Sequence, residues 1–162
     1  MANQANVITF EDDQAFRQLS YSWATSYDTK NWDLLSSICT KEVQTLYSAL
    51  DARLGDKTVP KEDYISSFSS DASLGDKRVR TQHLLGAVHF EKTGSDEAVG
   101  HWQIQAAHYR TLADGSVKEW ISASYVDHIY ERVGGQWKFG GLRPHTKLWE
   151  RGHVLDVIGQ FD

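Results

Sequence analysis

The first third of the chain repeats hydrophobic residues with the period of a helix. Phe16, Leu19, Trp23 and Tyr27 recur three or four residues apart, after a run of acidic residues that suits a helix N-terminus. The pattern breaks where Tyr27 and Asp28 stand side by side. We therefore expect one long amphipathic helix that ends at this pair.

Shorter elements follow before residue 70. Asn31 precedes WDLLSSI and is a typical N-cap, which predicts a second, short helix. The segment VQTLYSAL favours a strand or a strand edge. Pro60 precedes acidic residues in VPKEDYISSF, which predicts the start of a third helix.

The second half of the chain changes to the pattern of strands. Residues 78–94, 97–115, 116–135 and 136–144 are rich in β-branched and aromatic side chains, and Gly, Asp and Ser separate them. These features predict an antiparallel meander, followed by a last amphipathic helix or lid over residues 146–161. Helices first and strands afterwards favour an α+β fold, a single cone-shaped domain over residues 1–162 in which a curved sheet wraps around helices.

A cone of this kind has an interior, and the period of two along a strand predicts which side chains face it. Three sets of alternate residues each combine polar and hydrophobic side chains. They are His83, Leu85, Ala87 and His89; Trp102, Ile104, Ala106 and His108; and Trp120, Ser122, Ser124, Val126 and His128.

Composition limits the classes of partner. The 162 residues are 40% hydrophobic and carry a net charge of −5 without a basic patch, which argues against binding to nucleic acid. Cys39 is the single cysteine, so no internal disulfide forms, and no segment has the pattern of a signal peptide or a membrane span. We expect an intracellular protein, cytoplasmic or endosomal, that acts on a small molecule.

Most familiar site motifs are missing from the sequence. The seven histidines form no HExxH or Cys-His ligand pattern, so we predict no metal site. The sequence also has no GxSxG elbow and no strand, GxGxxG and helix unit, which argues against a serine nucleophile and a nucleotide site. An isolated histidine on an amphipathic strand is more often structural than catalytic, and that alternative stays open for His83 and His108.

Several stretches resemble one known family. WATSYDTKNWD, TLYSALDARL, SLGDKRVRTQHLLGA, AAHYR, SAS and GGQWKFGGLRP occur in the order found in the scytalone dehydratases of fungal naphthol and melanin pathways. The resemblance covers nearly the whole chain, and RTQH after LGD is its most specific part. It implies a cone fold shared with ketosteroid isomerases, a lyase that needs no cofactor, a polyketide substrate and a homotrimer, for which Tyr109, Tyr125 and Ile129 are candidate interface residues.

The resemblance also implies a set of catalytic residues. In that family His83 would be the acid and base, Asp28 would charge-pair with His108, and Ser124 would fix the His83 ring. Two phenols would polarise the substrate carbonyl. The complete set is Tyr27, Asp28, Tyr47, His83, His108 and Ser124.

The substrate-binding positions depart from the family pattern. Val126 stands where the family carries an asparagine that binds a substrate hydroxyl, and Leu50 replaces a usual phenylalanine. Trp102 and Ser73 are further candidates for substrate contact. The C-terminal segment offers His153, Val154, Val157 and Ile158 where the family closes its pocket with phenylalanines. We therefore expect a substrate other than scytalone.

Three functions agree with the sequence. The first is a dehydratase that removes water from a β-hydroxy ketone of secondary metabolism through an enolate. The second is an isomerase or cyclase of the same fold, which would leave the substrate mass unchanged. The third is a cone domain that binds a ligand without chemistry.

Overall fold

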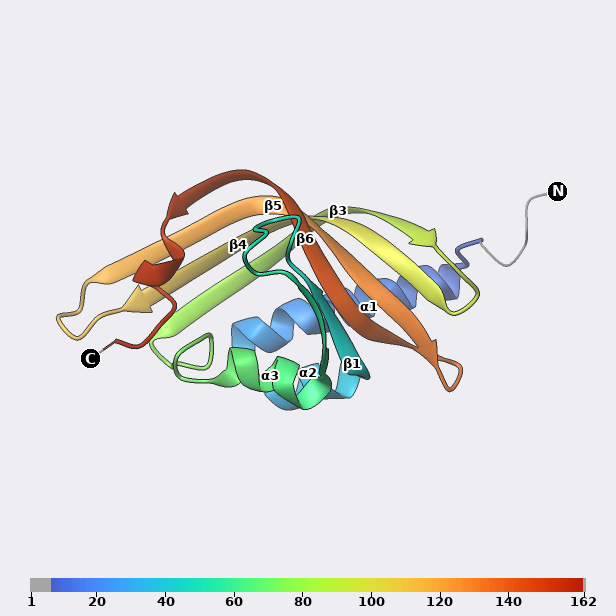
Figure 1. The fold of residues 1–162 in the computed structure, drawn as a ribbon, viewed down its shortest axis with the longest axis horizontal. Coiled ribbons are helices and arrows are strands. Elements are labelled where there is room, and N and C mark those ends of the chain that lie inside the picture. The colour runs from blue at the N-terminus through green and yellow to red at the C-terminus, as the bar shows by residue number, and fades with distance from the viewer. Residues whose placement is uncertain (1–6, 162) are drawn as a thin grey trace.

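A long helix lies beneath a strongly arched sheet in the computed structural model, which describes residues 7–161 (Figure 1). Within these residues the helices are α1 (Phe10–Thr29), α2 (Trp32–Ile38) and α3 (Lys61–Ser69). The strands are β1 (Cys39–Leu46), β2 (Asp56–Pro60), β3 (Val79–Lys92), β4 (Glu97–Thr111), β5 (Val117–Val133) and β6 (Gln136–Gly152). This arrangement confirms the α+β prediction.

Helix α1 begins with a capping box. The Thr9 side chain accepts a hydrogen bond from the Asp12 backbone, and the Asp12 carboxylate accepts one from Thr9 in return. The helix continues through Thr29 and ends at Lys30, which adopts a left-handed conformation with φ of 55°. The expectation that the helix ends at Tyr27 and Asp28 was therefore wrong, because both residues belong to its last turn.

The two shorter helices follow the sequence predictions. Asn31 caps α2 by accepting from the Leu34 backbone at 3.0 Å, and Pro60 is the N-cap of α3. Strand β2 was not foreseen, because its residues Asp56–Pro60 show no hydrophobic alternation. It is a strand because it pairs antiparallel with β1, and this pairing cannot be predicted from the residues of β2 alone.

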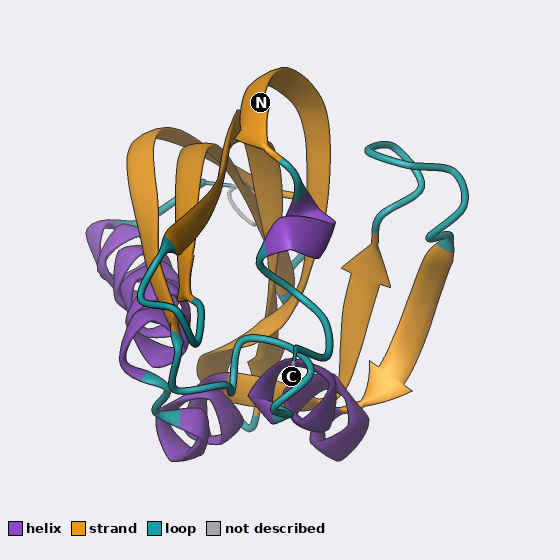
Figure 2. Cartoon of the chain, turned by 90° about the vertical axis from the view of Figure 1, so that its left-hand side faces the viewer, coloured by secondary structure: helices purple, strands orange, loops and turns teal. Residues whose placement is uncertain are grey.

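The sheet has the order β2-β1-β6-β5-β4-β3, with β3 at one edge. Strands β3 to β6 pair antiparallel as predicted, whereas β1 joins β6 in parallel. Gly141 allows that junction, since a Cβ atom there would lie 2.3 Å from the Gln44 carbonyl oxygen. Figure 2 shows the long strands curling on one side and the β1–β2 hairpin standing apart on the other.

The predicted facings hold for β4 and β5 but change within β3. Ile104, Ala106 and His108 face the interior, as do alternate residues of β5. A bulge between Leu85 and Val88 shifts the register of β3, so that His89 pairs with His101 on the outer face. The placement of His89 on the inner face was therefore wrong.

The C-terminal segment is largely a strand. Residues up to Gly152 continue β6, and only Val154–Asp156 form a single turn of 3-10 helix, η2. The expected amphipathic helix over residues 146–161 is thus replaced by strand and one turn. In Figure 2 this turn lies between the long strands and the β1–β2 hairpin.

A buried arginine binds the end of the chain to the sheet. Arg110 has no exposed surface, and its Nε donates to the Val157 carbonyl oxygen at 2.5 Å. Its guanidinium also contacts Asp76 at 2.6 Å and lies 4.1 Å from the ring centre of Phe161. These contacts position the last turn over the interior.

No helix in residues 7–161 is long and apolar enough to cross a membrane.

Candidate active site

The interior of the cone contains a cavity of about 560 Å³. The concave face of β3 to β6 forms one wall, and α1, α3, the β1–β2 hairpin and the C-terminal turn form the others. Eight of the predicted site residues line it: Tyr27, Tyr47, Leu50, Ser73, His83, His108, Ser124 and Val126. The fold thus brings together side chains that are far apart in the sequence.

Asp28 and His83 form the central polar contact of the site. The Asp28 carboxylate accepts hydrogen bonds from the His83 ring Nδ1 at 2.8 Å, from the His83 backbone N–H at 3.0 Å, and from Thr81 at 2.9 Å. The backbone N–H is available because β3 is an edge strand. Our prediction that Asp28 pairs with His108 was therefore wrong; its partner is His83.

The charge of Asp28 is favoured by these donors. Burial by itself raises the pKa of the carboxyl, but hydrogen bonds from the ring and backbone of His83, the electrostatic attraction between that imidazole and the carboxylate, and the Thr81 hydroxyl outweigh it. The pKa of Asp28 is held below its usual 3.8 as a result. An ionised carboxylate only accepts, so the Nδ1 atom of His83 carries the hydrogen and Nε2 is left as the basic nitrogen.

His108 lies beside His83 in a different environment. The two rings are 5.5 Å apart and perpendicular, and His108 stacks on Trp120 with 4.4 Å between ring centres. Its Nδ1 donates to the Trp120 carbonyl oxygen at 3.2 Å. Burial first, and the neighbouring His83 second, lower the pKa of His108 to about 4, so this ring is neutral at pH 7 and its Nε2 is a hydrogen-bond acceptor.

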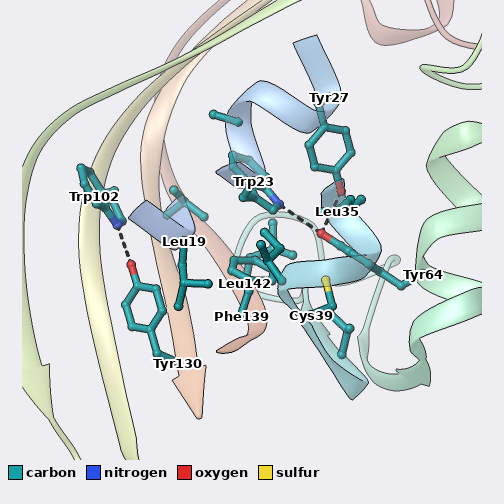
Figure 3. Close-up of a cluster of buried hydrophobic side chains, with 14 of the residues drawn as sticks. Leu19, Trp23, Tyr27, Leu35, Cys39, Tyr64, Trp102, Tyr130, Phe139 and Leu142 are labelled. Carbon is teal, nitrogen blue, oxygen red and sulfur yellow. Dashed lines mark hydrogen bonds between the residues drawn. The ribbon is translucent and has the colours of Figure 1, made fainter. Parts of the chain in front are cut away.

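Three tyrosines line the cavity, one more than the sequence predicted. Burial raises the pKa of Tyr47 to about 12 and that of Tyr27 well above 10. The third is Tyr64 on α3, whose hydroxyl lies 2.8 Å from that of Tyr27 (Figure 3). All three are neutral phenols near pH 7. Sequence reasoning missed Tyr64 because it stands at an apolar position of the α3 pattern, where a tyrosine is typical of the hydrophobic core.

Serines lie on the sheet wall of the cavity. Ser122 and Ser124 lie two residues apart on β5 and both line the cavity, whereas Ser73, which also lines it, belongs to the loop after α3. Ser124 was expected to fix the His83 ring, but the Nδ1 atom of that ring contacts Asp28. Ser124 is thus a cavity residue without the predicted bond to His83.

The remaining walls are apolar. Val126 is 1% exposed and lines the cavity together with Leu142 and Pro144, while Val154 and Ile158 close it from the C-terminal turn. Trp102, expected at this site, lies elsewhere: its indole N–H donates to Tyr130 at 3.1 Å in a neighbouring part of the core (Figure 3).

The arrangement has the parts needed for proton transfer to and from carbon. It offers one imidazole at the wall of a mainly apolar cavity, a carboxylate bonded to one nitrogen of that imidazole, and neutral donors around it. Within residues 7–161, no three His, Cys, Asp or Glu side chains gather in a cluster that could bind a metal ion.

Known proteins are similar to this chain in sequence and in fold. The family model for scytalone dehydratase matches residues 7–159. Scytalone dehydratase arp1 of Aspergillus fumigatus is 38% identical over 155 residues, which cover 93% of this chain and 90% of that protein. Scytalone dehydratase of Pyricularia oryzae is 32% identical over 151 residues, which cover 91% and 87%.

Solved structures agree in fold at low sequence identity. A putative scytalone dehydratase from Novosphingobium aromaticivorans superposes with a TM-score of 0.72 at 14% identity, covering 93% of each chain. A type 2 hexachlorocyclohexane dehydrochlorinase, LinA, superposes with a TM-score of 0.67 at 16% identity, covering 89% of this chain and 90% of that one.

Proposed function

The chain belongs to the scytalone dehydratase family, and from that premise we propose that it removes water from a β-hydroxy ketone of polyketide origin, with His83 as both base and acid. Its relatives are named scytalone dehydratases, and the chain is accordingly an enzyme of the lyase class. The observation that carries the mechanism is the contact of 2.8 Å between Asp28 and His83 at the wall of the cavity.

The first step is removal of a proton from the carbon beside the carbonyl. His83 Nε2 takes this proton, and the electron pair of the C–H bond moves into the enolate. The resulting imidazolium is stabilised by the Asp28 carboxylate, which remains ionised because its pKa is low. Neutral tyrosine hydroxyls at the cavity wall donate to the enolate oxygen.

The second step expels the hydroxyl group. The enolate re-forms the carbonyl, a carbon–carbon double bond forms, and the C–O bond breaks while His83 returns its proton to the departing oxygen as water. One imidazole serves both steps when the proton and the hydroxyl lie on the same face of the substrate ring. His108 Nε2, with its lone pair available, accepts a hydrogen bond from a substrate hydroxyl and fixes that geometry.

The substrate we propose differs from scytalone at one edge. Val126 presents an isopropyl group where the family has an amide, and Leu50, Val154 and Ile158 add further aliphatic surface. A buried hydroxyl against Val126 would lose about 1 to 3 kcal/mol of hydrogen bonding. We therefore propose a ketone with an apolar or substituted edge at that position.

Mass spectrometry of purified protein with scytalone and related polyketide β-hydroxy ketones tests the reaction. A dehydratase yields a product lighter by one water, an isomerase or cyclase yields an isomer of unchanged mass, and a binding domain yields nothing. His83→Asn abolishes the loss of water, whereas His89→Asn on the outer face retains it. Turnover by a folded His83→Asn protein would refute the mechanism.

A further inference from the structure

The mechanism needs a tyrosine donor to the enolate oxygen but does not yet say which of the three cavity tyrosines supplies it. Tyr64 is 1% exposed, and its oxygen accepts two hydrogen bonds, from the Trp23 indole N–H at 3.1 Å and from the Tyr27 hydroxyl at 2.8 Å (Figure 3). All three side chains line the cavity. The cluster therefore combines the cavity wall with a buried polar network.

In both of these hydrogen bonds Tyr64 is the acceptor, so its own hydroxyl hydrogen has no partner in either. A phenol oxygen accepts up to two hydrogen bonds and donates one, while an indole N–H only donates. Trp23 and Tyr27 fill both acceptor positions of Tyr64, and no group in residues 7–161 accepts the Tyr64 hydrogen. A buried donor without an acceptor is costly, so this hydrogen is suited to an acceptor that arrives with the substrate.

The cluster also lies next to the proposed base. The ring centres of Trp23 and Tyr27 are 5.3 Å and 5.4 Å from that of His83. A ketone held with its acidic carbon at His83 Nε2 has its carbonyl oxygen only two bonds from that carbon. The oxygen thus lies on the side of the cavity where the cluster can reach it.

We propose that Tyr64 is a catalytic residue whose hydroxyl donates a hydrogen bond to the carbonyl oxygen of the substrate and to the enolate that follows. Tyr27 is then a positioning residue, because its own hydrogen is directed to Tyr64. No proton is transferred from Tyr64. This inference rests on the proposed enolate-forming reaction and names the donor within it.

The two bonds that Tyr64 accepts strengthen it for this role. Hydrogen bonds accepted by an oxygen polarise its own O–H, which becomes a better donor. Burial raises the pKa of Tyr64 well above 10, while the bonds from Tyr27 and Trp23 act in the opposite direction. The phenol therefore stays neutral and is a pre-oriented donor at the point where negative charge develops.

Tyr64→Phe removes the hydroxyl and keeps the ring. We expect kcat to fall about 100-fold with little change in KM, the effect typical of losing one donor to a developing oxyanion. Tyr27→Phe should lose less, and the double variant should lose no more than Tyr64→Phe alone. Near-normal kcat in Tyr64→Phe, or a larger loss in Tyr27→Phe than in Tyr64→Phe, overturns the proposal.

Tyr130 offers a matched control. Its hydroxyl also accepts from an indole, Trp102 at 3.1 Å, and bonds to Ser20 at 2.7 Å, but it does not line the cavity. Tyr130→Phe leaves similar groups unpaired and should lose similar stability in urea unfolding. It should retain kcat, so an equal loss of kcat in both variants would mean that the Tyr64 effect is structural.

A ligand titration separates this proposal from the proposed reaction. With 2-naphthol bound in the cavity, a donor at Tyr64 favours the naphtholate, so Tyr64→Phe raises the apparent pKa of the bound ligand and Tyr130→Phe leaves it unchanged. The absorbance measurement needs no turnover. If the wild type proves inactive but Tyr64→Phe still raises the pKa of the bound ligand, the dehydratase assignment fails and the donor role of Tyr64 stands. If Tyr64→Phe does not fold, 3-fluorotyrosine at position 64 must lower that pKa; no shift overturns the proposal.

Discussion

Replacing Asp28 with Asn tests the contact on which the mechanism depends. The wild-type carboxylate accepts from three groups, the His83 ring, the His83 backbone and Thr81. An amide has one oxygen and one NH2 group. In either orientation the NH2 group therefore faces a hydrogen-bond donor, either the ring N–H or the backbone N–H of His83. If the NH2 group faces the ring, His83 adopts the opposite tautomer and its Nε2 is no longer the free base.

The magnitude follows from the geometry. With the Nδ1 and Oδ1 atoms 2.8 Å apart, the centres of charge of an imidazolium and a carboxylate lie about 4 Å apart, which gives about 4 kcal/mol at an effective dielectric constant of about 20. The Asp28 side chain is 23% exposed, so the larger value of a dry interior does not apply. Part of this energy survives in the amide dipole, and a loss of about 2.7 kcal/mol corresponds to about a 100-fold fall in turnover.

The assay is kcat on the substrate that mass spectrometry identifies, with folding checked by circular dichroism and urea unfolding. Asp127→Asn is the matched control, because Asp127 accepts from the ring Nδ1 of His101 at 2.7 Å on the outer face. It should cost stability without a comparable loss of kcat. Turnover of Asp28→Asn within about two-fold of wild type would refute the electrostatic role assigned to this carboxylate.

Three further predictions concern specificity, acid stability and assembly. Val126→Asn should raise kcat/KM for scytalone roughly ten-fold and lower it for the native substrate, and no gain with scytalone would remove Val126 as a specificity determinant. Hydrogen bonds from Arg78 above all hold the pKa of Asp76 well below 3.8, so its contribution is present above the unfolded value and is lost as pH falls below about 4. Urea unfolding at pH 7 and at low pH should therefore show a smaller acid loss in Asp76→Asn than in wild type. We expect a homotrimer through the outer sheet face around Tyr125 and Ile129, and sedimentation at the 18.4 kDa mass of one chain would contradict it.

The sequence predicted the elements whose stability is local. Side-chain capping at Asn31, the proline before α3 and the alternation along β4 and β5 depend on neighbours a few residues away, and the structure has each of them. Elements that depend on a distant partner were missed or misplaced. Strand β2 exists through β1, and the C-terminal residues join β6 as a strand because β5 is long enough to pair with them through Gly152.

The same division holds within the candidate site. Strand parity and the family resemblance together predicted eight of the residues that line the cavity. Neither of them could identify hydrogen-bond partners on different elements. Asp28 binds His83 because the last turn of α1 lies against the edge strand β3, and only tertiary packing sets that distance.

The sequence by itself determined that this chain is an α+β cone of the scytalone dehydratase family, with histidines, an aspartate and tyrosines as its candidate chemistry. Tertiary structure alone decided which imidazole the carboxylate orients, and it brought Tyr64 to the hydroxyl of Tyr27 from a helix 37 residues away. The physical reason is that residue type and spacing reflect local preferences, whereas hydrogen bonds of about 3 Å depend on how separate elements pack.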